Sequence, residues 1–331
     1  MSFSIGDLTL GNPGQLFLLA GPCVLQERDL ALRIAEQVRD ICARLEVPYV
    51  FKASFDKANR SSWSGHRGPG LEAGLELLGR TLGMGISCGV LAINIGHELG
   101  HRRARRDQAF AQLLLWSSAY AHFYVEHNRG HHARVGSHED PATARKNEPL
   151  QLFVLRSIVM GVISAWRLEA QRLRRRGMGS WSWRNQALLH FALQLASWAL
   201  LWGWLGTQVF LPILAAQLIG ILLLESVDYI EHYGLVRRRR SDGRLEPFGR
   251  QHAWNANHPL GRSLLFDLTR HSDHHADATR PYQVLRHLEG APALPFGYSA
   301  AVLVAWLPPL WFLLMNPRVD AVRKHFGMPG I

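Results

Sequence analysis

Nine of the 17 histidines in this 331-residue chain gather in four short strings. The strings are His97-Glu-Leu-Gly-His101, Glu126-His127-Asn-Arg-Gly-His131-His132, Asp228-Tyr-Ile-Glu-His232-Tyr-Gly and Arg270-His271-Ser-Asp-His274-His275. In three of them the histidines recur at about one helical turn, so their side chains can converge on one point. Clustered imidazoles at this spacing predict a metal site.

The number of imidazoles exceeds what one ion can bind. A zinc ion takes about four ligands, and a catalytic one keeps a position open. Nine clustered histidines therefore predict two metal ions. Imidazole binds zinc, copper, iron and nickel, so ligand type alone leaves the metal open. Isolated histidines such as His66, His190, His287 and His325 are expected to be ordinary core or surface residues.

The four strings closely resemble those of the membrane alkane 1-monooxygenases, which are relatives of the histidine-rich fatty acid desaturases. The chain carries HELGH at 97–101, EHNRGHH at 126–132, DYIEHYG at 228–234 and LTRHSDHH at 268–275. Asp228 and Thr269 replace the asparagine and glutamine usual in that family, and neither replacement removes a histidine. Other family-like strings extend the resemblance over roughly residues 82–320.

The resemblance implies a non-haem di-iron centre, because the family holds two iron ions with these strings. The implied ligands are His97, His101, His127, His131, His132, His232, His271, His274 and His275. The implied reaction uses O2 and electrons from rubredoxin, which rubredoxin reductase reduces, to convert an n-alkane or related fatty acyl chain to the terminal alcohol. A desaturase with similar two-metal chemistry and an inactive membrane metal-binding protein are the alternatives.

Several carboxylates stand beside the histidines. We expect them to accept hydrogen bonds from imidazole N–H groups and so to fix the orientation of the rings, although any one could ligate a metal directly. They are Glu98, Glu126, Asp140, Glu231 and Asp273. His138, His252 and His258 belong to family-like strings outside the ligand set and are candidates for similar supporting contacts.

The net charge of +11 is concentrated in arginine clusters beside apolar stretches. The clusters lie at 102–106, 172–176 and 237–240. Basic residues that flank apolar helices are typical of the cytoplasmic side of a membrane protein, so we expect a lipid bilayer and no nucleic acid as partner. The same arginines could bind acidic rubredoxin or lipid head groups. Three cysteines form no disulfide framework, and no signal peptide is evident.

Six apolar stretches follow residue 81, and their order limits which can cross a membrane. All histidine strings must lie on one side, so an even number of crossings must separate them. We therefore expect 188–205 and 209–227 to form a membrane hairpin, and 110–125 and 150–166 to lie in the interface. The stretch 82–95 is short for a span of about 20 residues. The segment 298–315 contains Pro308 and Pro309 and is a weak candidate. The expected protein is a mainly α-helical, multi-pass protein of a bacterial-type inner membrane with a cytoplasmic histidine-rich di-metal domain.

The first 80 residues have a different pattern. An apolar run at 16–20, an amphipathic helix at 28–45, a second strand at 49–54 and a helix from 70 predict a βαβα arrangement. The amino-acid sequence of this segment resembles the beginning of 3-deoxy-8-phosphooctulonate synthase, a (β/α)8 barrel that condenses phosphoenolpyruvate with arabinose 5-phosphate. The resemblance implies a metal-ligand position at Cys23 and substrate-binding positions at Lys52, Lys57 and Arg60.

Two of eight βα units cannot close a barrel, whose site is built from many strand ends. We therefore expect residues 1–80 to be a fused, non-functional α/β fragment of a TIM barrel, and synthase activity is the less favoured alternative. Residues 81–331 are expected to form the membrane di-iron domain without the family's first membrane helices. We expect this replacement of the N-terminal helices to impair hydroxylation.

Overall fold

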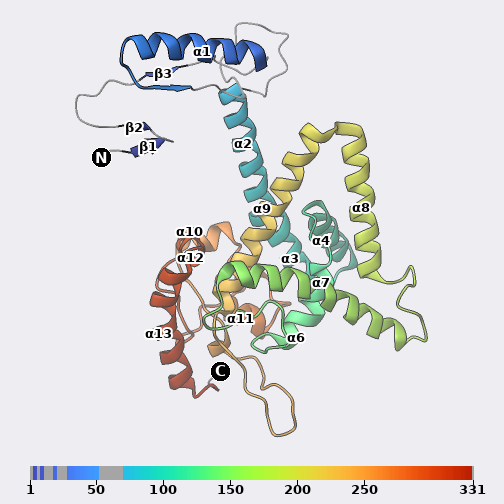
Figure 1. Ribbon diagram of the computed structural model, residues 1–331. Coiled ribbons are helices and arrows are strands. Elements are labelled where there is room, and N and C mark those ends of the chain that lie inside the picture. The colour runs from blue at the N-terminus through green and yellow to red at the C-terminus, as the bar shows by residue number, and fades with distance from the viewer. Residues whose placement is uncertain (1–2, 6–7, 11–17, 21–27, 52–69, 330–331) are drawn as a thin grey trace. The chain divides into compact units, whose positions relative to one another are not determined.

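The computed structural model describes residues 3–5, 8–10, 18–20, 28–51 and 70–329 (Figure 1). The chain forms two compact units, Met1–Gly79 and Arg80–Ile331. Each unit has its own internal packing and is described by itself.

The first unit contains two pairs of short strands and a helix. β1 (Phe3–Ile5) and β2 (Leu8–Leu10) are antiparallel, whereas β3 (Leu18–Ala20) and β4 (Tyr49–Phe51) are parallel. Parallel neighbours need a crossover connection, and α1 (Arg28–Arg44) lies between them in the chain. The strand–helix–strand order expected from the sequence is confirmed. The antiparallel β1–β2 pair is an element that the sequence analysis did not predict.

Four residues singled out in this unit lie outside the described residues. They are Cys23, Lys52, Lys57 and Arg60. Their synthase-like roles, and the descent of this segment from a barrel, stay predictions.

Helices make up most of the remaining described chain, so the expected mainly helical fold is confirmed. In chain order they are α2 (Gly70–Ser87), the π-helical turn η1 (Cys88–Ile93), α3 (Asn94–Gly100), α4 (Arg105–Ser117), α5 (Phe123–Glu126), the π-helical turn η2 (His127–His131), α6 (His132–Arg134), α7 (Leu150–Arg174), α8 (Gln186–Leu205), α9 (Thr207–His232), the 3-10 turn η3 (Arg250–His252), α10 (Pro259–Leu264), α11 (His271–Ala276), the 3-10 turn η4 (Tyr282–Val284), α12 (Tyr298–Ala305) and α13 (Pro308–Phe326).

Among the residues that the structure describes, four helical segments are long and apolar enough to cross a membrane. They are Leu75–Gly100, Leu150–Arg174, Gln186–Leu205 and Thr207–His232. A crossing needs about 20 residues, so the expectation that the stretch 82–95 is too short is wrong. It lies inside a 26-residue helix formed by α2, η1 and α3. The chain is a membrane protein.

The hairpin expected at 188–205 and 209–227 corresponds to α8 and α9. Asn185 caps α8 by accepting a hydrogen bond from Leu188 N at 3.1 Å. Gly206 joins the two helices at φ 72°, a left-handed conformation that glycine adopts without steric cost. Few residues of either helix are buried inside the protein: 11% of the most apolar 18-residue stretch of α8 and 17% of that of α9, which leaves the other side chains for lipid.

α7 differs from this hairpin. In its most apolar 18-residue stretch, 39% of the residues are buried inside the protein, more than twice the share in either hairpin helix. In the view of Figure 1 it runs across α8 and α9. Arg156 lies in the second turn of α7 and donates two hydrogen bonds of 2.7 Å to Glu148. The length of α7 permits a crossing, and our expectation that it lies in the interface stays a prediction.

The expected continuous stretch 110–125 is broken in the structure. α4 ends at Ser117, Ala119 takes a positive φ of 58°, and α5 begins at Phe123. The turn redirects the chain so that the helix carrying His127 starts in a new direction. Non-glycine residues seldom adopt such a φ, which costs roughly 1–3 kcal/mol and persists only where surrounding packing requires it.

Close helix packing brings η1 against α9. A Cβ atom added to Gly220 would lie 2.7 Å from the Cβ of Cys88, so no larger residue fits there without movement. Small residues at such crossings are typical of membrane helices. This packing holds η1, which leads directly into α3, against α9.

The main core lies among α7, α9, α12 and α13. Tyr229, Tyr233, Trp254 and Trp311 are fully buried there, and each large apolar side chain contributes about 1.5–3 kcal/mol when removed from water. The segment 298–315 is split between α12 and α13, with prolines in the first turn of α13. It is not among the four long apolar helices, in agreement with its expected weakness as a span.

Candidate metal centre

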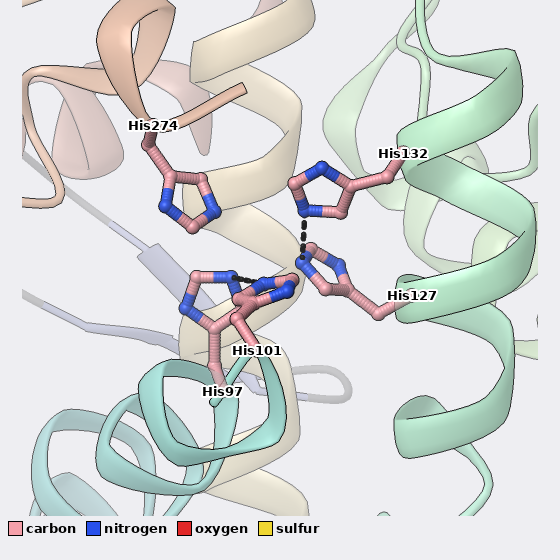
Figure 2. Close-up of side chains that lie close together, drawn as sticks. All are labelled: His97, His101, His127, His132 and His274. Atoms are coloured by element: carbon pink, nitrogen blue, oxygen red, sulfur yellow. Dashed lines mark hydrogen bonds between the residues drawn. The ribbon is translucent and has the colours of Figure 1, made fainter. Parts of the chain in front are cut away.

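The nine histidines of the four strings come together in two groups. The five-histidine group contains His97, His101, His127, His132 and His274, and the four-histidine group contains His131, His232, His271 and His275. Within each group, one potential ligand atom per residue lies within 4.8 Å of the others. Figure 2 shows the five-histidine group, whose rings from three separate segments point toward one another.

Short helical segments carry eight of these rings, and the end of one long helix carries the ninth. α3 provides His97, and His101 directly follows it. α9 ends on His232, so the long apolar helix delivers its last residue to the centre. α11 provides His271, His274 and His275.

The π-helical turn η2 divides two neighbouring histidines between the groups. The His132 N–H bonds the carbonyl of His127, five residues earlier, which is the π-helical pattern. His132 Nε2 thereby lies 3.0 Å from His127 Nε2 in the five-histidine group. His131 Nε2 instead lies 3.3 Å from His275 Nε2 in the four-histidine group. Such turns occur often at functional sites.

The burial and the missing partners of these rings fit metal binding. Only His101 and His132 are partly exposed, and the other seven are buried. Several ring nitrogens have no hydrogen-bond partner among the described residues: Nδ1 of His127, His232, His271 and His275, and both nitrogens of His274. Buried polar atoms almost always have partners. Eight of the rings meet in pairs through Nε2 atoms 3.0–3.3 Å apart, and metal ions would bind these converging Nε2 atoms and one nitrogen of His274.

Burial also sets the charge of the rings. Desolvation, reinforced by neighbouring imidazoles, lowers the pKa of His127, His132 and His275 well below its usual range and that of His274 to about 3. The rings are therefore neutral at pH 7. Neutral imidazole is the form that ligates a metal.

His131 is the exception, and the reason is Asp140. Desolvation lowers the pKa of His131, but the Asp140 carboxylate outweighs it and the pKa is raised. His131 Nδ1 lies 2.9 Å from Asp140 Oδ2, and Thr143 Oγ1 donates to the same oxygen at 2.5 Å. Asp140 thus supports an imidazole in the way expected from the sequence. Its hydrogen bond leaves Nε2 of His131 free to face the four-histidine group.

Glu231 lies near a second imidazole. Its Oε1 is 3.2 Å from His271 Nδ1, but neither atom has a well-aligned hydrogen bond. Glu231 therefore stands beside the four-histidine group without orienting His271 as Asp140 orients His131.

The other three carboxylates do not bond imidazoles, contrary to expectation. Glu98 accepts from Arg102 at 2.6 Å and Glu126 from Arg134 at 2.9 Å. Asp273 binds Arg280 and Arg286. Guanidinium groups are charged donors that match carboxylates better than a neutral ring does.

The arginine partners also set the charge of Asp273. Desolvation would raise its pKa, but hydrogen bonds from Arg286 and Arg280 outweigh burial and lower the pKa to about 2. The ionised carboxylate ties α11 to the segment 280–286, so Asp273 positions the backbone between His271 and His274.

None of the three additional histidines belongs to either group. His138 and His258 are exposed. His252 is buried, accepts from Gly249 N at 2.9 Å, and lies 3.1 Å from Glu246. It holds a loop in place.

Two supporting features were missed by sequence reasoning. Asn255 binds the start of α11, accepting from Ser272 N at 2.9 Å and donating to Ser272 Oγ at 2.7 Å. Glu225 is buried in α9 and accepts a hydrogen bond from Tyr120. A lone acid within an apolar stretch was the available signal for Glu225, since such residues are costly unless they have a function.

Comparison with known proteins places the chain in a family. A fatty acid desaturase family model matches residues 76–302, and a DAHP synthetase I family model matches residues 2–100. The chain is 43% identical over 249 residues to Alkane 1-monooxygenase 1 of Pseudomonas aeruginosa, covering 74% of this chain and 64% of that protein. It is 45% identical over 247 residues to Alkane 1-monooxygenase of Ectopseudomonas oleovorans, covering 74% of this chain and 61% of that protein.

A further relative has a different name. The xylene/toluene monooxygenase hydroxylase component XylM of Pseudomonas putida is 30% identical over 257 residues, covering 77% of this chain and 68% of that protein. The chain spans less than two thirds of the length of the two alkane monooxygenases described above. The desaturase model covers all of the histidine strings, and the resemblance inferred from those strings is confirmed. This chain belongs to the fatty acid desaturase family.

Proposed function

We propose that this protein is a membrane monooxygenase that transfers one oxygen atom of O2 to the terminal carbon of an n-alkane or a related fatty acyl chain. One observation carries the proposal: nine imidazoles converge in two buried groups at the end of apolar helices. The alkane monooxygenases among its relatives favour this reaction over desaturation.

The two groups would each hold one iron ion, with the nine histidines as ligands. When bound, the irons supply the redox chemistry that activates O2, which zinc cannot supply because it has no accessible redox change. The protein's part is to keep the imidazoles neutral and to orient them. Asp140 performs the second task for His131.

An apolar cavity is the proposed substrate site. It has a volume of about 350 Å3, within the range of small-molecule sites. Its wall comes from helices on several sides, including Val90, Leu223, Val227, Leu265 and Val302. Such a wall excludes water and accepts a hydrocarbon chain.

The cavity approaches the metal centre through Asn94. This residue lines the cavity and is one helical turn before His97 on α3. Its Nδ2 is buried without a hydrogen-bond partner among the described residues. The arrangement lets a chain end reach the five-histidine group while the rest of the chain stays among apolar side chains.

Electrons would come from rubredoxin, reduced by rubredoxin reductase, on the cytoplasmic side of a bacterial inner membrane. The arginine clusters support this side, because basic residues flank apolar helices at the cytoplasmic face. Arg103, Arg105 and Arg240 are exposed, and so is Arg106, which pairs with Asp107; these side chains could meet an acidic carrier or lipid head groups.

Metal analysis with a hydroxylation assay tests the function. Detergent-purified protein should contain about two irons per chain, with nitrogen ligands by X-ray absorption, and should convert octane to 1-octanol with O2, rubredoxin and its reductase. Toluene, assayed in parallel, tests the methyl-arene alternative raised by the XylM relative. Zinc alone from iron-replete cells, or sulfur bound to the metal, would contradict the metal assignment. Two irons without any oxygenated product would favour the inactive metal-binding protein.

The synthase alternative is not favoured. The desaturase model matches residues 76–302, most of the chain, and the synthase-like match is confined to residues 2–100. Of the nine histidines, only His97 lies within the residues that the synthase-like model matches.

A further inference from the structure

A small polar cavity lies beside the histidines and belongs to neither group. It has about 10 Å3 of space, which is room for about one water molecule. Polar side chains dominate its lining: Tyr120, His122, Glu126, Ser157, Glu225 and Asp228. Water in such a site would have several hydrogen-bond partners.

Glu225 is the residue of this cavity that most requires an explanation. It lies in α9, one of the helices apolar enough to cross a membrane, and is 2% exposed. Tyr120 donates a short hydrogen bond to its Oε1, the Ser157 hydroxyl lies close to the carboxylate, and Oε2 has no well-aligned hydrogen bond in the described part of the chain. A buried polar atom without a partner is costly, which points to a ligand such as water at Oε2.

The cavity is also placed next to the metal centre. Glu225, Asp228 and His232 recur at three- and four-residue intervals, so they follow one face of α9 toward its end. Pro141 and Ala142, which also line the cavity, directly follow Asp140, the partner of His131. The cavity therefore adjoins two segments that lead to the four-histidine group.

The charges around these acids leave Glu225 without a cation of its own. The ionisable groups that act on Glu225 and Asp228 include Tyr120, Glu126, His131, Asp140, Glu231 and Arg156. Arg156 is bound to Glu148, and no arginine or lysine among the described residues forms an ion pair with Glu225. His122, with its pKa lowered to about 4 by burial and by His190, is a neutral ring on the same cavity wall.

The proposed reaction needs protons at this place. One oxygen atom enters the C–H bond and the other leaves as water, so R–CH3 + O2 + 2e⁻ + 2H⁺ gives R–CH2OH + H2O, with reduced rubredoxin as the electron source. Both protons must reach a centre that is buried from solvent. Positioned acids connected through one water are the usual means of such transfer.

We infer that Glu225, with Tyr120 and a water in this cavity, forms a proton relay to the four-histidine side of the centre. This inference rests on the proposed function. Glu225 passes a proton from Oε2 to the cavity water and regains one from solvent by way of the same water, while the Tyr120 hydroxyl keeps its own proton and holds Oε1 by its hydrogen bond. Asp228 contributes a polar wall, a task that the asparagine usual at this position in the family can also perform.

Glu225→Gln tests the relay, because the amide keeps the shape and the Tyr120 acceptor but cannot pass a proton. We expect octane hydroxylation to fall at least about tenfold, with unchanged iron per chain. A larger share of the electrons from the reductant should reduce O2 to hydrogen peroxide. Ser226→Ala is the matched control. Ser226 is buried beside Glu225 but bonds Leu222 O of its own helix. This control should keep turnover within about threefold, which is well below an acid–base effect.

Infrared spectroscopy of the metal-free protein gives a readout that does not depend on activity. We expect a carbonyl band of a protonated carboxylic acid that is lost in Glu225→Gln and shifts within minutes in D2O. Absence of that band, or its failure to exchange, would overturn the relay. So would unchanged turnover, or loss of iron, in Glu225→Gln. If the wild-type protein hydroxylates no substrate, the proposed function fails, whereas the infrared result still decides whether Glu225 exchanges protons with water.

Discussion

At the scale of single residues, Asp140 gives His131 a different environment from the other rings. The carboxylate binds Nδ1 at 2.9 Å and itself accepts from Thr143. It is 1% exposed, so the pair acts in a medium where hydrogen bonds and charges are strong. A fixed ring presents Nε2 in one direction.

Asp140→Asn should weaken iron binding by about 10–100-fold, because the amide is a weaker acceptor and frees the ring to rotate. Competition with a chelator, followed by metal analysis, measures the affinity. Glu139→Gln is the control, since Glu139 is exposed and pairs with Arg239 at the surface. Equal iron affinity in Asp140→Asn and wild type would show that the carboxylate does not support a ligand.

His274→Ala should lower both iron content and hydroxylation. Both of its ring nitrogens lack partners among the described residues, and the ring faces four others. We expect turnover to fall at least about a hundredfold, because removal of a ligand should cost at least as much as removal of a residue that supports one. His287→Ala, at an exposed position outside both groups, should change neither quantity. Retention of two irons in His274→Ala would remove His274 from the ligand set.

At the scale of elements, α9 connects the membrane part to the centre. One end forms the hairpin with α8, the other ends on His232, and its side chains line both cavities. Leu223 and Val227 face the apolar cavity, whereas Glu225 and Asp228 face the polar one. One helix thus separates the proposed substrate path from the proposed proton path.

Val227→Phe should shift substrate preference toward shorter alkanes. The larger ring would occupy part of the 350 Å3 cavity, at a cost of about 1–3 kcal/mol if the packing cannot adjust. Product profiles from an equimolar mixture of alkanes measure the shift. Leu218→Phe makes the same kind of change at an exposed position of α9 outside the cavity. If both variants keep the wild-type profile, the cavity does not hold the alkane.

At the scale of the whole molecule, the centre should contribute to stability because it joins distant parts of the chain. Its nine histidines come from α3 and the residue after it, η2, α6, α9 and α11, and they span residues 97 to 275. Without metal, these segments meet through buried rings with few partners.

Removal of iron with a chelator should therefore lower the unfolding temperature by roughly 10 °C. A ligand at a thousandfold its Kd adds about 4 kcal/mol, and 1 kcal/mol shifts Tm by about 2–4 °C in a chain of this size. Thermal unfolding in detergent, with and without iron restored, measures it. An identical Tm for the metal-free and reloaded protein would mean that the centre is held together by the helices alone.

Lys52→Ala and Arg60→Ala should change neither iron content nor hydroxylation. Both positions precede the unit that contains all nine histidines. Iron analysis and the octane assay on each variant test the separation. A loss of turnover in Lys52→Ala with iron retained would show that the first unit takes part in catalysis.

The sequence by itself predicted the candidate ligands and a count of two metals, and it determined the helical class and the α8–α9 hairpin. These follow from local periodicity and composition, which are properties of a few neighbouring residues. Tertiary structure alone decided how His131 and His132 are divided between the groups, because the division depends on the π-helical turn. It also decided that Glu98, Glu126 and Asp273 bind arginines and not imidazoles. A carboxylate's partner depends on which donors the fold brings within about 3 Å, and sequence spacing does not give that distance.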